Sequence, residues 1–210
     1  MGSSNAGRSW EHKAAALVSA ILHPLLMPLG TLVMLLMVDG VLKYRVGLFA
    51  YLFVLLFINT LAPAVSLALL KRRGVISDLD IRNRGERIMP FLIVLAYYVM
   101  AYVLVRGGEA VVVPVFYQQV LLALVVAIAS AWLVTWRFKI SMHMMAQGGI
   151  MGVFLRVAML QPSWDMAWTS ALILCAGLVG WSRLRLGAHR PLEVYTGYAL
   201  GLLTVSVVLF

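Results

Sequence analysis

Four residues near the end of the chain have the types and the spacing of a phosphate-handling site. In the stretch SRLRLGAHRPLE, Ser182 and Arg183 are followed by His189 and then by Glu193. The planar fork of an arginine binds two phosphoryl oxygens at once, and a neutral histidine attacks phosphorus when another group holds its tautomer. Glu193 comes four residues after His189, so the two side chains lie one turn apart on one face of a helix. The spacing predicts that Glu193 orients His189 as a nucleophile.

A second histidine stands in another polar stretch, KISMHMMAQGG, which runs from 139 to 149. Cleaving a phosphate ester needs cations around the phosphoryl oxygens, a nucleophile in line and an acid for the leaving alkoxide. We expect His143 to protonate the leaving oxygen and later to activate water. Lys139 and Ser141 of the same stretch are predicted to bind the phosphate.

A third polar stretch, IRNRGERIMP at 81–90, contributes Arg82, Arg84 and Arg87. Arginines at the end of a membrane span commonly contact lipid headgroups, but we expect at least one of these three to join the phosphate site, with Arg87 first. Just before them, Asp78 and Asp80 form a loose D-x-D pair that is able to hold Mg²⁺ on a diphosphate.

Together the three stretches resemble the type 2 phosphatidic acid phosphatase superfamily, which are integral-membrane lipid phosphate phosphatases. The family's third motif, SR-x5-H-x3-D, is matched at 182–193 except that Glu193 replaces the aspartate. Its second motif, PSGH, is matched by Ser141 and His143, with Ile140 in place of Pro and Met142 in place of Gly. The resemblance covers residues 71–205.

The family's first motif, K-x6-RP, is matched least well. Arginines precede Pro90 without being adjacent to it, and Asp80 stands at the lysine position of a strict match. The change of aspartate to Glu193 adds one methylene and can displace the carboxylate by about 1 Å, a shift that lowers rates by ~10²-fold.

The resemblance implies a metal-independent phosphatase with no cofactor, acting through a phospho-histidine at His189 with His143 as the acid. Glu193 would orient His189, and Ser182, Arg183 and the first-motif arginines would bind phosphate. The substrates that the resemblance implies are phosphatidic acid, phosphatidylglycerol phosphate, polyprenyl diphosphates or a lipid A phosphate.

The composition indicates a membrane protein. Of 210 residues, 63% are hydrophobic, and the mean hydropathy is +0.96, whereas soluble domains are about half apolar. The single cysteine, Cys175, excludes a disulfide framework and a cysteine-based metal site. The formal charge of +9 is concentrated between apolar segments, which indicates membrane lipids and anionic substrates rather than nucleic acid as partners.

After a polar tail at 1–13, we expect a single all-α domain at 14–210, a polytopic bundle of six or seven transmembrane helices with a core like that of the phosphatase family. A spanning helix needs about 20 apolar residues. The apolar segments are 14–38, 46–70, 90–105, 118–136, 141–160, 166–181 and 191–210. His23 and two prolines interrupt the first segment, and His23 is expected at a kink or facing the lumen. Gly148, Gly149 and Gly152 are expected to allow close helix packing.

This order of segments places the polar stretches 71–89, 137–143 and 182–190 on one side of the membrane, because two spans separate each from the next. That side carries 13 of the 17 lysines and arginines, and the positive-inside rule makes it cytoplasmic. The expected location is a bacterial cytoplasmic membrane.

Two other functions remain open. A magnesium-dependent prenyltransferase predicts two aspartate-rich loops, of which the sequence offers only SDLD at 77–80. A non-catalytic binder or transporter of phosphorylated lipids agrees with Glu193 and with the imperfect first two motifs. The simplest interpretation of 182–193 is a basic loop that anchors a span at the headgroups.

Overall fold

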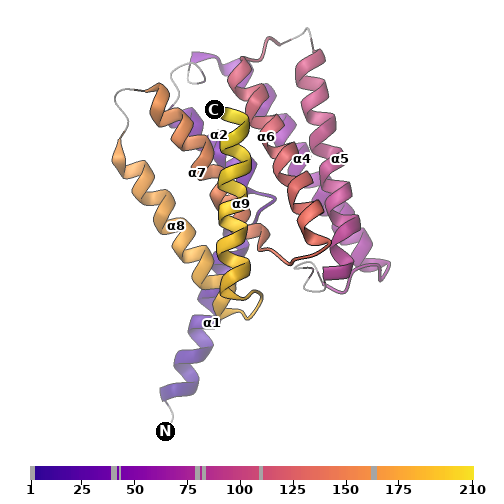
Figure 1. Cartoon of the computed structure of the whole chain (residues 1–210), viewed down its shortest axis with the longest axis vertical. Helices are drawn as coiled ribbons and strands as arrows, with labels where there is room; N and C mark the ends of the chain where they lie inside the picture. Colours follow the sequence, from indigo (N-terminus) through magenta and orange to yellow (C-terminus); the bar gives the residue numbers. More distant parts are fainter. Residues whose placement is uncertain are drawn as a thin grey trace.

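The chain folds as an all-α, multi-pass helical bundle in a computed structural model that describes residues 3–38, 42, 44–78, 81, 84–108, 111–161 and 165–210, without the side chains of 3–9 and 84. No strand occurs within these ranges. The helices are α1 (Ser3–Ile21), α2 (Met27–Val38), α4 (Val46–Arg72), the short 3₁₀ helix η1 (Arg84–Arg87), α5 (Ile88–Gly107), α6 (Val115–Thr135), α7 (Met142–Leu160), α8 (Met166–Arg185) and α9 (Pro191–Leu209). Figure 1 shows their arrangement.

Six of these helices, α4 to α9, are long and apolar enough to cross a bilayer. Their bounds agree with the six predicted segments from 46 onward to within a few residues, which confirms the predicted all-α bundle. The broad apolar surface of the bundle, with exposed leucines, valines and phenylalanines on most helices, is what a lipid-facing exterior requires.

The first predicted segment, 14–38, is a broken helix. Pro24 has no N–H, and it disfavours the helical conformation at His23, so α1 ends at Ile21 and α2 begins at Met27. Thr60 of α4 donates a hydrogen bond of 3.0 Å to the carbonyl of Leu25, which satisfies a backbone acceptor within the break. The predicted polar tail is part of the same element, since α1 starts at Ser3 and projects from the bundle (Figure 1).

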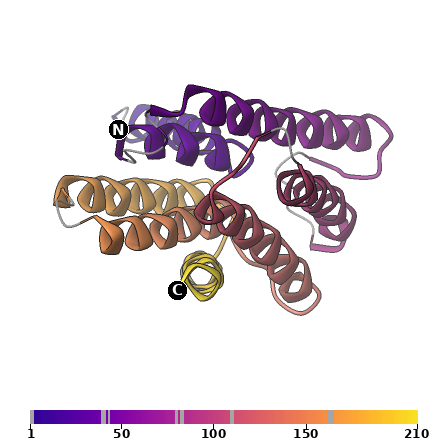
Figure 2. The ribbon, with the colours of Figure 1, turned by 90° about the horizontal axis from the view of Figure 1, so that it is seen from above.

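The closest helix pair is α7 with α9, and glycines make it possible. A Cβ on Gly148 of α7 would collide with the carbonyl of Tyr198, and a Cβ on Gly201 of α9 would collide with the carbonyl of Met145. Small residues at such positions let two backbones meet. Figure 2 looks along α9 and shows α7 beside it. The expected packing role of the glycines near 148 is therefore confirmed.

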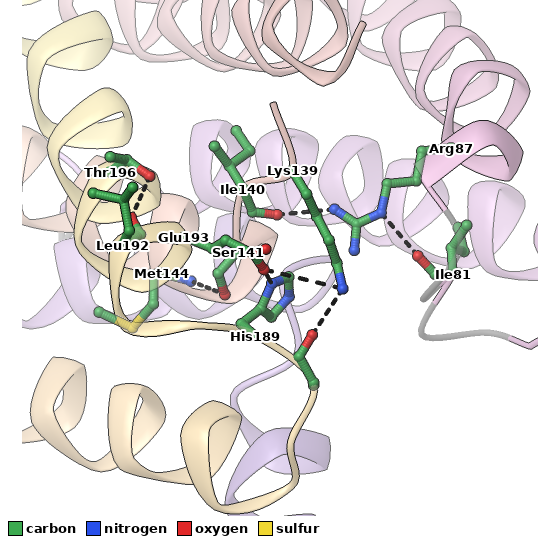
Figure 3. A network of polar contacts seen from close by, with 11 residues as sticks. Ile81, Arg87, Lys139, Ile140, Ser141, Met144, His189, Leu192, Glu193 and Thr196 are labelled. Atoms are coloured by element: carbon green, nitrogen blue, oxygen red, sulfur yellow. Dashed lines mark hydrogen bonds and ion pairs between the residues drawn. The ribbon is translucent and has the colours of Figure 1, made fainter. Parts of the chain in front are cut away.

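The three polar stretches converge at one end of the bundle, as their sidedness predicted. Arg87, where η1 ends, donates to the carbonyl of Ile140 at 2.9 Å, and Lys139 donates to the carbonyl of Ala188 at 2.9 Å. The backbone N–H of Ser141 donates to the carbonyl of Glu193 at 3.0 Å. Figure 3 shows the side-chain bonds of Arg87 and Lys139. The starts of α7 and α9 are thus joined, and each start carries part of the predicted site.

Candidate active site

His189 is held by Glu193 in the geometry that its spacing predicted. Gly187, with φ of 62°, turns the chain after α8, and Pro191 opens α9 at a position where its missing N–H costs nothing. His189 Nδ1 lies 2.7 Å from Oε2 of Glu193, and only 3% of the histidine side chain is exposed (Figure 3). Because a carboxylate accepts, Nδ1 carries the hydrogen and Nε2 carries the lone pair in the neutral ring.

The surroundings of His189 favour its neutral form. Burial is the main cause that lowers the pKa of His189, and the cationic side chains of Arg87, Arg183 and Lys139 lower it further, while the hydrogen bond to Glu193 raises it in part. The net pKa lies well below the ordinary value of about 6.5. At neutral pH the ring is therefore unprotonated, which is the form that a nucleophile needs.

His143 is the second residue of α7 and is buried. Ser141 caps that helix, because its hydroxyl oxygen accepts from the backbone N–H of Met144 at 3.5 Å. Nε2 of His143 lies 3.2 Å from Oγ and 3.1 Å from the carbonyl oxygen of Ser19 in α1. The ring of His23 meets the ring of His143 edge to face, with centroids 5.3 Å apart. The acid expected from the sequence is therefore held by residues of the first, broken segment.

The two arginines of the site are anchored by hydrogen bonds. Arg183 is 1% exposed, and its Nη1 donates to Oγ of Ser19 at 2.6 Å. Arg87 is also buried, and its guanidinium donates to the carbonyls of Ile81 and Ile140 at 2.8 and 2.9 Å (Figure 3). A buried guanidinium is a costly group unless it has partners or an anion to bind.

His143, His189, Arg87 and Arg183 face one cavity of about 200 Å³. Its polar part is lined by His23, Arg87, His143, Arg183 and His189. The remaining wall is apolar and is built from every helix from α2 to α9 except α8; examples are Leu35, Leu52, Phe91, Tyr98, Tyr117 and Val205. Polar groups gathered at one end of an apolar chamber fit an amphiphile with an anionic head and a hydrophobic tail.

The other predicted residues whose side chains the structure describes do not line this cavity. Glu193 and Lys139 lie behind His189, with Lys139 Nζ 4.0 Å from Oε2 of Glu193. Ser141 is the helix cap already described. Ser182 is fully buried, and its hydroxyl donates to the carbonyl of Ala15 at 2.6 Å, so it contacts α1 rather than the cavity. Arg82 lies outside the described residues, as does Asp80, and of Arg84 only the backbone is described.

Sequence reasoning missed one residue of the site, Ser19. It lies in the apolar second half of α1, 124 residues from the histidine it contacts, and no local spacing connects the two. His23 was predicted only as a kink or lumen residue, and its place on the cavity agrees with that prediction. The sequence does carry one weak signal for Ser19: it is a polar residue one helical turn before the His23-Pro24 break.

No protein-family model matches the chain, and no curated protein or solved structure is significantly similar to it. A function for this protein is therefore argued from the geometry of its own site.

Proposed function

We propose that the protein is a membrane lipid-phosphate phosphatase that works through a phospho-histidine, like the type 2 phosphatidic acid phosphatases that its motifs resemble. One observation carries the proposal: a histidine oriented by a carboxylate shares a largely apolar cavity with a second histidine and two arginines. This set provides a nucleophile, an acid and positive charge in one cavity, which are the requirements of phosphoryl transfer.

The proposed reaction has two steps. Nε2 of His189 attacks phosphorus while the bond to the leaving oxygen breaks, and His143 gives that oxygen a proton. Glu193 stabilises the ring, which becomes positively charged on phosphorylation, and Arg87 and Arg183 balance the charge on the phosphoryl oxygens. In the second step His143 takes a proton from water, whose oxygen attacks phosphorus and releases phosphate and free His189. No metal takes part in this scheme.

The proposed substrate is a lipid phosphate or a polyprenyl diphosphate. The apolar wall of the cavity supports this choice, because a soluble phosphate ester would leave that surface unfilled. Phosphatidic acid, phosphatidylglycerol phosphate, a polyprenyl diphosphate and a lipid A phosphate all have the required head and tail. We place the site at the cytoplasmic face of a bacterial cytoplasmic membrane, on the distribution of lysines and arginines.

The test is phosphate release from these four lipids by purified, detergent-solubilised protein in excess EDTA. The wild type and His189→Ala are compared with His12→Ala, a matched control on the exposed part of α1. We expect release by the wild type and by His12→Ala, and none by His189→Ala. Activity that needs added Mg²⁺ would favour the prenyltransferase, and activity that survives His189→Ala would contradict the nucleophile.

A second candidate, a non-catalytic binder of phosphorylated lipids, is favoured by the position of Ser182. The hydroxyl of this motif residue donates to Ala15 instead of facing the cavity. Saturable binding of phosphatidic acid without release of phosphate from any of the four lipids would support this candidate and contradict the phosphatase.

A further inference from the structure

The last turns of α1 contact three of the site residues predicted from the sequence, although α1 lies outside the region that resembles the phosphatase family. The carbonyl of Ala15 accepts from Ser182. Ser19 lies between Arg183 and His143, with its hydroxyl 2.6 Å from the guanidinium and 3.2 Å from the imidazole. These contacts join the first membrane segment to the groups that would bind phosphate and deliver a proton.

The break in the first segment explains why Ser19 is able to do this. The last four carbonyls of a helix have no backbone N–H of a following turn to bond to. The helix α1 ends at Ile21 because Pro24 follows. Ser19 is in that last turn, so its carbonyl oxygen is directed to a partner outside the helix. Nε2 of His143 fills this role at 3.1 Å.

The chemistry of the two oxygens of Ser19 then defines the state of His143. A carbonyl oxygen only accepts, so the contact is a hydrogen bond only if Nε2 carries the hydrogen. Nδ1 is therefore the nitrogen that gains and loses the catalytic proton. A guanidinium only donates, so the hydroxyl oxygen of Ser19 accepts from Arg183. The carbonyl of Ser19 thus selects the tautomer of the acid, and the hydroxyl of Ser19 anchors an arginine of the phosphate site.

We propose that Ser19 is the positioning residue of the general acid His143, and that it couples this acid to Arg183. The inference rests on the proposed function and adds to it a residue of the broken first segment. His23, packed edge to face on the same imidazole, limits rotation of the ring from a second direction. The first membrane segment is then part of the active site rather than an anchor.

The first test compares two substrates whose leaving groups differ. An alkyl phosphate such as phosphatidic acid needs a proton on its leaving oxygen, whereas the p-nitrophenolate released from p-nitrophenyl phosphate does not. Ser19→Ala keeps the carbonyl and removes the hydroxyl that contacts both His143 and Arg183. We expect it to lower kcat for phosphatidic acid by about 10²-fold, because the acid and the arginine are both displaced. The aryl phosphate depends on the arginine alone, so its kcat should fall by less than about 10-fold. Ser19→Thr, which keeps the hydroxyl, should restore most of the activity.

Ser66→Ala is the matched control, because this serine of α4 is also hydrogen-bonded within the bundle but does not line the cavity. It should behave as the wild type with both substrates. Equal losses with both substrates in Ser19→Ala would overturn the inference, because they would indicate that Ser19 acts on Arg183 or on the fold and not on the acid. Unchanged activity of Ser19→Ala, with His143→Gln inactive on phosphatidic acid, would overturn the inference and leave the proposed function standing. A wild type that releases no phosphate from any substrate would overturn both.

The second test does not depend on activity or on a variant of Ser19. Nitrogen-15 NMR of the neutral imidazoles in the wild-type protein distinguishes a ring nitrogen that bears hydrogen from one that bears a lone pair. The signals of His143 are identified by their loss in His143→Gln. Hydrogen on Nε2 would support the inference, and hydrogen on Nδ1 would overturn it.

Discussion

The two histidines of the site face the same cavity but have different kinds of partner. His189 is bonded to Glu193, a carboxylate in the first turn of the helix that follows it. His143 is bonded to the neutral oxygens of Ser19, beside the cation Arg183. A carboxylate compensates positive charge on an imidazole, whereas a carbonyl and a hydroxyl orient the ring and add no charge. The first environment suits a nucleophile that becomes charged when phosphorylated. The second leaves the positive charge of a protonated His143 uncompensated, which favours passing its proton to a leaving oxygen.

The largest expected effect comes from exchanging each histidine for glutamine. His189→Gln should remove phosphate release from phosphatidic acid and from p-nitrophenyl phosphate alike, because no phospho-enzyme forms. His143→Gln should lower release from phosphatidic acid by about 10²- to 10⁴-fold, the range of general acid catalysis, and spare the first turnover of the aryl phosphate. Burst kinetics with the aryl substrate measures that turnover. A His143 variant without a burst would contradict the assignment of different roles.

The next effect concerns the helix pair that holds the two histidines in register. Gly201→Ala places a methyl group against the carbonyl of Met145, so α7 and α9 must separate. A displacement of about 1 Å is expected to lower kcat by ~10²-fold and to lower the thermal unfolding midpoint in detergent. Gly177→Ala is the control, since open space surrounds Gly177 in α8, and it should keep full activity. Normal activity in Gly201→Ala would show that the close approach does not align the site.

A smaller effect is expected when Glu193 is shortened to aspartate, the residue usual in the family that the chain resembles. The carboxylate of Glu193 already lies 2.7 Å from Nδ1 of His189. Glu193→Asp should therefore retract the carboxylate from its partner and lower kcat by about 10-fold, by analogy with the lower limit for carboxylates that orient metal-bound histidines. Glu11→Asp, at the exposed ion pair with Arg185, is the control. A rise in kcat for Glu193→Asp would show that this position is not adapted to glutamate.

The same contrast between the two histidines explains what the sequence was able to predict. The His189–Glu193 pair is local, so a spacing of four residues in a helix predicted it, and the order of the spans predicted that three polar stretches share one end of the bundle. Ser19 was not predictable, because its partners lie on α7 and α8, and contacts between distant helices depend on packing. The orientation of Ser182 was missed for the same reason, since α1 supplies its acceptor.

The smallest expected effect is a shift in the pH dependence of kcat/KM, which reports the free enzyme. The nucleophile acts when His189 is neutral, so activity is lost on the acid side as the pH falls through its pKa. Burial lowers this pKa first, and the nearby cations lower it further, so the acid limb should lie below the ordinary value of about 6.5. The unfolded chain binds this proton more readily than the native one, so stability is also lost as the pH falls below about 6.5.

Lys139→Met tests how far a nearby cation lowers the pKa of His189. Removing the lysine charge should move the acid limb upward, toward pH 6.5, whereas Arg190→Gln should not move it, because Arg190 is exposed to solvent, which screens its charge. Profiles of kcat/KM from pH 4 to 8 with p-nitrophenyl phosphate make the comparison without a contribution from protonation of the leaving group. An acid limb that moves to lower pH in Lys139→Met would contradict a direct effect of Lys139 on His189. An equal shift of the acid limb in Lys139→Met and Arg190→Gln would contradict it as well. Since His143 is not needed for this leaving group, a limb that remains in His143→Gln belongs to the nucleophile.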